Sequence, residues 1–190
     1  MIILMVTVLV SLSSCNYGCT KTNLTQDEKD WFNVYLKSQI VVFESNLNRR
    51  DTFDITHIGE SYSVCNRLEL GEYQNHSLTL IMKPRKCRTQ NGYCSIDMDF
   101  VKDVGNEACV KYFRVFDCAV GPREISKDKE KQIQLKDGSS INAVYFESHT
   151  GDPDYSDYSS DIESFYWSKK QGLVRYTTLF GETFDLVEYH

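Results

Sequence analysis

The sequence has no apolar run long enough to cross a membrane as a helix, and no charged residue before Lys21. A helix needs about 20 apolar residues to span the hydrocarbon core of a bilayer. The apolar run at 1–12 is shorter and is followed by the small residues Ser13 and Ser14. A segment of this kind is typical of an export signal that is later removed. We therefore expect the protein to leave the cytoplasm.

The motifs of the common enzyme classes are also missing. There is no C-x-x-C pair, no G-x-S-x-G elbow and no glycine-rich phosphate loop, which excludes the usual zinc, thioredoxin, hydrolase and nucleotide sites. The four histidines are scattered, and His57 has the same parity as Phe53 and Ile55, as expected of a core histidine. We expect no catalytic residue, no enzymatic activity and no cofactor.

The charge balance disfavours nucleic acid as a partner. The chain carries 27 acidic and 21 basic side chains, for a formal net charge of -6, whereas nucleic-acid binding needs clustered Lys and Arg to replace phosphate counterions. One short basic stretch occupies 83–88. It is typical of a solvated turn, with an anionic glycan or a lipid headgroup as the alternative contact.

An acidic stretch at 151–161 contains Asp152, Asp154 and Asp157, whose carboxylates are the type of ligand that calcium prefers. The spacing fails the EF-hand pattern, because a serine stands at the third ligand position and the sharp-turn position lacks glycine. We expect a solvated loop and no metal site, and these three residues are the ligands to mutate if calcium does bind.

Seven cysteines are present, and one of them, Cys15, directly follows the apolar segment. The other six are an even number, which in an exported protein favours disulfides, although sequence alone cannot choose among the fifteen possible pairings. We expect Cys87 and Cys94 to close a small loop. The six disulfide candidates are Cys19, Cys65, Cys87, Cys94, Cys109 and Cys118.

Alternating apolar residues predict strands along most of the chain. In 95–101, for example, Ile96, Met98 and Phe100 share one parity while Asp97 and Asp99 share the other, as in a sheet with one wet face. No βαβ pattern occurs. Similar runs predict strands at 39–44, 51–58, 61–70, 77–82, 95–101, 108–117, around Ile133 and Leu135, and at 141–146, 162–167, 173–177 and 183–187.

Two local signals refine this prediction. Thr25-Gln26-Asp27-Glu28 has the form of a capping box and predicts one short helical turn. Asp137-Gly138 between two apolar runs predicts a hairpin with a type I′ turn. The fold class that follows is all-β: an antiparallel sandwich or partly closed barrel of about ten short strands, with one short N-terminal helical turn.

Leu12-Ser13-Ser14-Cys15 resembles the lipobox of bacterial lipoproteins, in which the cysteine thiol is joined to diacylglycerol before cleavage in front of it. The whole layout is similar to the small lipoproteins of Gram-negative envelopes: a lipobox, a polar tether, Trp31-Phe32, and then a Val-Phe-Glu-Ser-Asn strand. The likeness extends to the segments 165–176 and 181–186. It implies lipidation at Cys15, anchoring in the envelope and no catalytic activity.

These observations predict a signal peptide at 1–14, a lipidated polar tether at 15–25 and a single β domain at 26–190. We expect a lipid-anchored, noncatalytic binding or structural module of the cell envelope, with the outer membrane favoured over the inner. Its partners would be the membrane, through the lipid, and a protein, glycan or lipid ligand.

Two alternatives stay open. The first is a half-barrel that carries a lipid or another small apolar ligand. The second is a secreted, disulfide-bonded soluble domain, in which the signal is cut within 11–14 and Cys15 keeps its thiol. Possible glycosylation acceptors at Asn23 and Asn75 fit this second alternative.

Overall fold

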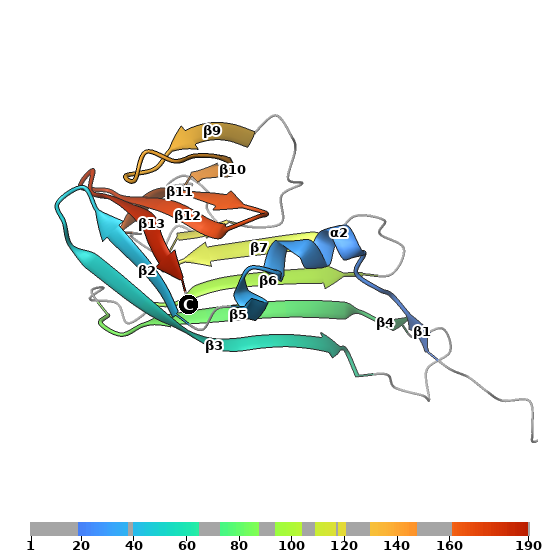
Figure 1. The fold of residues 1–190 in the computed structure, drawn as a ribbon. Helices are drawn as coiled ribbons and strands as arrows, with labels where there is room; N and C mark the ends of the chain where they lie inside the picture. The colour runs from blue at the N-terminus through green and yellow to red at the C-terminus, as the bar shows by residue number, and fades with distance from the viewer. Residues whose placement is uncertain are drawn as a thin grey trace, which may run out of the picture.

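The computed structural model describes residues 19–37, 40–64, 73–87, 94–103, 109–116, 118–120, 130–147 and 161–189. Its main feature is one antiparallel sheet of eleven strands, curled so that its two halves face each other (Figure 1). The all-β, sandwich-like fold expected from the alternating sequence pattern is confirmed.

The strands of this sheet follow the predicted runs closely. In chain order they are β2 (Ile40–Ser45), β3 (Arg50–Tyr62), β5 (His76–Pro84), β6 (Ile96–Lys102), β7 (Val110–Val115), β8 (Cys118–Val120), β9 (Glu130–Gln134), β10 (Ser140–Glu147), β11 (Ile162–Ser168), β12 (Gly172–Thr178) and β13 (Thr183–Tyr189). The predicted strand at 61–70 differs, because Ser61 and Tyr62 end β3 and 65–70 lie outside the described residues.

Two meanders make up the sheet. One runs from β2 to β8 and the other from β9 to β13, and the antiparallel pairing of β13 with β2 joins them. The strand order is therefore β8-β7-β6-β5-β3-β2-β13-β12-β11-β10-β9. Among the described strands the sheet is open, with β8 and β9 at its two ends.

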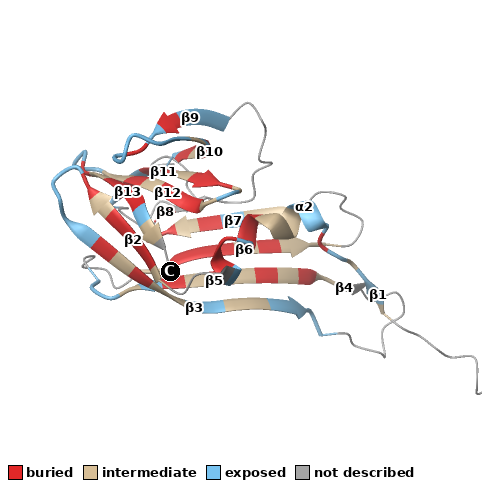
Figure 2. Ribbon diagram, in the orientation of Figure 1, coloured by how far each residue is buried: buried red, intermediate tan, exposed pale blue. Residues whose placement is uncertain are grey.

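Aromatic side chains fill the space between the two halves of the sheet. Phe113 of β7 lies 4.9 Å from Phe146 of β10 and 5.1 Å from Trp167 of β11, measured between ring centroids. Figure 2 shows buried residues recurring along the strands of both halves. Each such ring pair contributes about 0.5–1.5 kcal/mol beyond the burial of its surface, so the interior is a packed core.

The N-terminal segment covers part of this core. The predicted capping box is confirmed: Thr25 caps α2 (Gln26–Lys29), and Glu28 bonds back to Thr25. The 3₁₀ helices η1 (Asp30–Phe32) and η2 (Tyr35–Lys37) follow. Their rings pack on the sheet, with Phe32 at 5.0 Å from Phe100.

The expected tether at 15–25 is ordered over the part that the structure describes. β1 (Thr20–Lys21) pairs in parallel with β4 (Tyr73–Gln74). The backbone N–H of Leu24 donates to His76 Nδ1 at 2.9 Å, and Leu24 is buried. Within the described residues, Thr20–Leu24 therefore pack on the β domain that was expected to begin at residue 26.

A β-bulge corrects the prediction for His57. The register between β3 and β5 shifts between Ile55 and His57, and a one-residue shift turns every following side chain to the opposite face. His57 is consequently exposed, and its ring lies against Gly59. The core histidine is His76 instead, which is fully buried.

Three hairpins share one turn geometry, which differs from the predicted type I′ turn. The loops 46–48, 136–138 and 179–181 are each closed by a pair of backbone bonds, and their third residues, Asn48, Gly138 and Gly181, have φ of 59°, 83° and 76°. This pattern is a type I turn followed by one left-handed residue. Asp137 is not left-handed; its carboxylate instead accepts from the Ser139 N–H at 2.9 Å.

Gly172 offers a test of how tightly the N-terminal segment packs on the sheet. Its φ is +72°, and a Cβ there would overlap the Tyr35 hydroxyl, which accepts from the Leu173 N–H at 2.7 Å. Gly172→Ala should lower the free energy of unfolding by about 1 kcal/mol from backbone strain and about 2 kcal/mol more from overpacking.

The matched control is Gly181→Ala, because Gly181 has a similar φ of +76° and open space around it. Only the strain of about 1 kcal/mol should appear there. Urea denaturation of both variants measures the difference. Equal losses would show that Tyr35 does not pack against Gly172.

Candidate functional site

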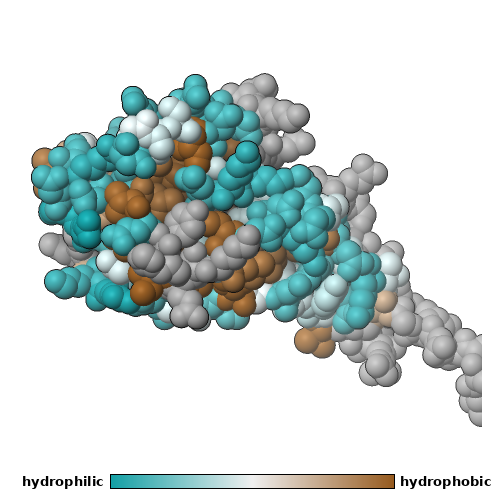
Figure 3. All heavy atoms as spheres, in the orientation of Figure 1, coloured by the Kyte–Doolittle hydropathy of each residue, from teal (hydrophilic) through white to brown (hydrophobic). Residues whose placement is uncertain are grey.

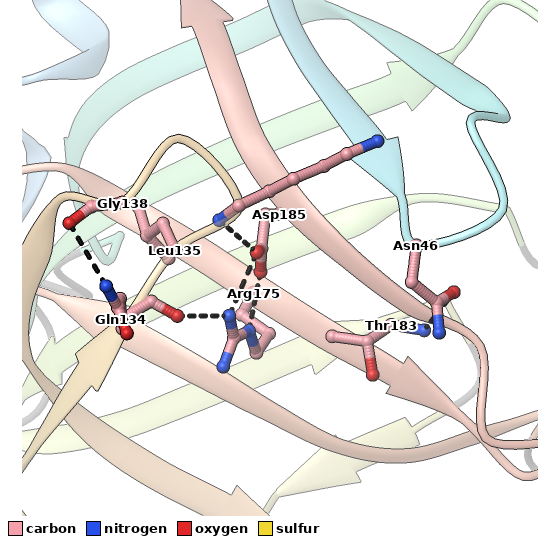
Figure 4. A pocket seen from close by; sticks show the side chains of 8 residues that line it. Asn46, Gln134, Leu135, Gly138, Arg175, Thr183 and Asp185 are labelled. Carbon is pink, nitrogen blue, oxygen red and sulfur yellow. Dashed lines mark hydrogen bonds and ion pairs between the residues drawn. The ribbon is translucent and has the colours of Figure 1, made fainter.

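An open pocket of about 470 Å³ lies where the β9–β10 hairpin folds against β12, β13 and the β2–β3 turn (Figure 4). This volume is within the range of small-molecule sites, about 300–1,000 Å³. The residues that line it are Asn46, Gln134, Leu135, Lys136, Gly138, Arg175, Thr183 and Asp185.

The pocket belongs to a continuous row of side chains on the outer face of the sheet. Strand register pairs Tyr145 with Tyr166, Tyr166 with Arg175, Arg175 with Asp185, and Asp185 with Glu44. Residues paired across neighbouring strands point to the same face. Five adjacent strands therefore present one row that begins with aromatic rings and ends with charges.

Arg175 and Asp185 form the base of the pocket. The guanidinium donates to both carboxylate oxygens, from Nε at 2.5 Å and from Nη2 at 2.9 Å, and Nη2 also donates to the Gln134 carbonyl at 2.6 Å. The hydrogen bond to Asp185 raises the pKa of Arg175, although burial opposes it. Because the pair is bidentate and largely buried, its geometry is fixed.

Lys136 fastens the β9–β10 hairpin to the β2–β3 turn. Its ammonium donates to Glu44 Oε1 at 2.6 Å, to Asn48 Oδ1 at 2.8 Å and to the Ser45 carbonyl at 2.9 Å. Its backbone N–H donates to Asp185 Oδ2 at 2.7 Å. All three ammonium protons therefore donate hydrogen bonds, and the hairpin turn that lines the pocket is held against β2 and the β2–β3 turn.

Apolar residues stand at the tips of two neighbouring turns. Leu47 is 64% exposed and Phe180 is 91% exposed. The backbone N–H of Asn46 donates to the Thr183 carbonyl at 2.9 Å, which holds the two turns together. Hydrophobic atoms are visible among hydrophilic ones at the end of the molecule where these turns lie (Figure 3).

The titratable side chains that line the pocket are held in hydrogen bonds. Lys136, Arg175 and Asp185 are all engaged with one another or with neighbouring groups. The pocket therefore presents hydrogen-bonding groups whose positions are fixed.

The structure places only some of the predicted site residues. The bridge between Cys87 and Cys94 is present, with the two Cα atoms 5.5 Å apart. Cys19 is disulfide-bonded as well. Cys15, Cys65 and the candidate calcium ligands Asp152, Asp154 and Asp157 lie outside the described residues. Within the described ranges, no group of acidic, histidine or cysteine side chains could hold a metal ion.

Cys109 and Cys118 differ from the expected disulfide pattern, because both are buried thiols. Cys118 lies opposite Val115, six residues along from Cys109, which corresponds to about 20 Å in an extended strand. A disulfide requires Cα atoms closer than about 7 Å. Burial raises the pKa of Cys109 to about 11, so its thiol is unreactive at neutral pH.

Sequence reasoning missed the pocket. Its residues come from four separate parts of the chain, and Lys136 lies 92 positions from Glu44. The one local signal was the predicted hairpin at Asp137-Gly138, which indicates a turn but not the strands against which it folds.

Comparisons with known protein families, with characterised proteins and with solved structures found no match to this chain. Among the residues that the structure describes, no helix is both long and apolar enough to span a bilayer.

The hydrogen bond between Lys136 and Glu44 predicts that removing Lys136 changes the pKa of Glu44. The hydrogen bond from Lys136, together with one from Arg50, holds the pKa of Glu44 below its ordinary value. A carboxylate with a lowered folded pKa stabilises the fold above its unfolded pKa, and this contribution disappears as pH falls through the folded pKa. In Lys136→Met the pKa of Glu44 should rise, because its main partner is gone.

Carboxyl ¹³C chemical shifts measured from pH 2 to 7 report the pKa of Glu44. This interval extends about two units or more to each side of an ordinary carboxyl pKa. Asp54 is the internal control, since Arg85 lowers its pKa and Lys136 is not among the causes. A Glu44 titration that Lys136→Met leaves unchanged would contradict the proposed fastening of the hairpin.

Proposed function

We propose that this chain is an exported, lipid-anchored protein of the bacterial cell envelope whose β domain binds a ligand without transforming it. The observation that carries the binding role is the pocket between the β9–β10 hairpin and β12–β13, with its fixed hydrogen-bonding groups. The anchoring rests on the Leu12-Ser13-Ser14-Cys15 motif after an apolar segment.

The filled interior favours a binding module over the half-barrel carrier. A carrier needs room for an apolar ligand between the two halves of the sheet. Phe53, Phe100, Phe113, Phe165 and Trp167 occupy that space, each at most 2% exposed. Pocket residues such as Arg175 and Asp185 are polar and lie on the outer face, where they suit a hydrophilic ligand.

The arrangement of the domain suits attachment through its N-terminus. β1 lies at one end of the molecule, while the β2–β3 and β12–β13 turns lie at the other (Figure 1). A lipid on Cys15 would therefore hold the pocket on the side away from the membrane, where a ligand can reach it. We favour the outer membrane as the site of anchoring.

The bridge at Cys19 places a condition on this proposal. Cys19 is disulfide-bonded. A sulfur that carries diacylglycerol cannot also form a disulfide. In the lipid-anchored protein Cys15 therefore cannot be the partner of Cys19, whereas a Cys15–Cys19 bridge would favour the secreted alternative.

The Cys15→Ser variant tests the anchor. The full chain, expressed in a Gram-negative host, should move into the detergent phase on Triton X-114 separation and should incorporate labelled palmitate. Cys15→Ser should lose both properties, because its hydroxyl cannot form the thioether, and each lost acyl methylene removes about 0.8 kcal/mol of membrane affinity. Peptide mapping without reduction should find Cys19 joined to a cysteine other than Cys15.

Ser14→Ala is the matched control, since it keeps a small residue before Cys15 and should stay in the detergent phase. If the unaltered protein remains in the aqueous phase, or if mapping joins Cys19 to Cys15, the lipid anchor is refuted.

A further inference from the structure

Each charged side chain that lines the pocket is paired with a side chain of opposite charge. Arg175 is neutralised by Asp185 through two hydrogen bonds, and Lys136 is neutralised by Glu44. A charged ligand would have to displace one of these partners and leave a largely buried charge unpaired, which is costly. The site therefore favours a ligand that has no charge.

The polar groups left over are neutral donors and acceptors. In the part of the chain that the structure describes, Asn46 Nδ2 and Gln134 Oε1 have no hydrogen-bond partner, and both residues line the pocket. The Thr183 hydroxyl has only a long contact, 3.4 Å, with Thr177. Amide and hydroxyl groups that can each donate or accept are well matched to hydroxyl-bearing ligands.

Aromatic side chains continue the site beyond the pocket. Tyr166 lies beside Arg175 in the cross-strand row, and its ring centroid is 5.0 Å from that of Tyr145. Both tyrosines are partly exposed, and the Lys131 ammonium lies over the Tyr145 ring, 4.2 Å from its centroid. From Tyr145 to Asp185 the row crosses three strand spacings, about 14 Å. This length exceeds a single small ring and accommodates a short chain of them.

We propose that the ligand of this pocket is an uncharged saccharide chain. The C–H face of a sugar ring would lie against Tyr166, and the hydroxyl groups of the chain would bond to Asn46, Gln134 and the fixed Arg175–Asp185 pair. This inference rests on the proposed binding function and specifies its ligand.

The test titrates the protein with three classes of probe, each of four units. They are uncharged tetrasaccharides of N-acetylglucosamine, glucose or mannose, an anionic heparin tetrasaccharide, and an uncharged tetrapeptide. Backbone amide shifts and calorimetry report binding. At least one uncharged saccharide should bind saturably and shift Asn46, Gln134 and Thr183, and the heparin fragment and the peptide should leave these residues unshifted.

Substitutions in the pocket test which residues contact the saccharide. Gln134→Ala and Tyr166→Ala should each weaken binding about tenfold, which corresponds to about 1.4 kcal/mol, while Tyr166→Phe should keep the affinity because the ring remains. Tyr112→Ala is the control, since Tyr112 is a 41% exposed tyrosine of β7, on the other half of the sheet. Tyr112→Ala should bind as the unaltered protein does.

Two results would overturn the inference in different ways. If the heparin fragment or the peptide shifts the pocket residues and no uncharged saccharide does, the proposed ligand is refuted while the binding function stands. The proposed ligand is also refuted if no saccharide shifts these residues at about 10 mM. That concentration is about ten times a dissociation constant of 1 mM, which corresponds to about -4 kcal/mol. The lipid anchor is then still judged separately by Cys15→Ser.

Discussion

The pairing of β2 with β13 is the contact on which the rest of the structure depends. Each meander alone has one face of apolar side chains and no partner for it. Joining Phe43 to Leu186 in register makes a single sheet that curls over itself. The same pairing sets the β2–β3 and β12–β13 turns side by side, and the β9–β10 hairpin then closes the pocket against them through Lys136.

The two faces of this sheet carry different kinds of side chain. The inner face carries a row from Phe146 through Phe165 and Tyr176 to Phe184, in which neighbouring rings stack at 4.8 Å at both ends. Directly behind it, the outer face carries the row of tyrosines and charges that leads to the pocket. Because a strand alternates its side chains, rigid packing on one face fixes the positions on the other.

Local patterns in the sequence predicted the strands well, since alternation, the capping box at Thr25 and the hairpin at Asp137-Gly138 depend on neighbouring residues. Three features could not be found in this way. The bulge near Ile55 reverses parity and exposes His57, and Asp137 caps its own turn instead of taking a left-handed conformation. The pocket depends on contacts such as Lys136 with Glu44, whose residues lie far apart in the sequence.

Amide hydrogen exchange measured by NMR tests most directly whether β2 and β13 join the two meanders into one sheet. If β2 and β13 are central strands, the amides of Phe43 and Leu186 should exchange only through global unfolding, with equal protection, and their Hα protons should show cross-strand contacts. Fast exchange in β2 or β13, or two separate levels of protection for the two meanders, would contradict a single sheet and the pocket that it forms.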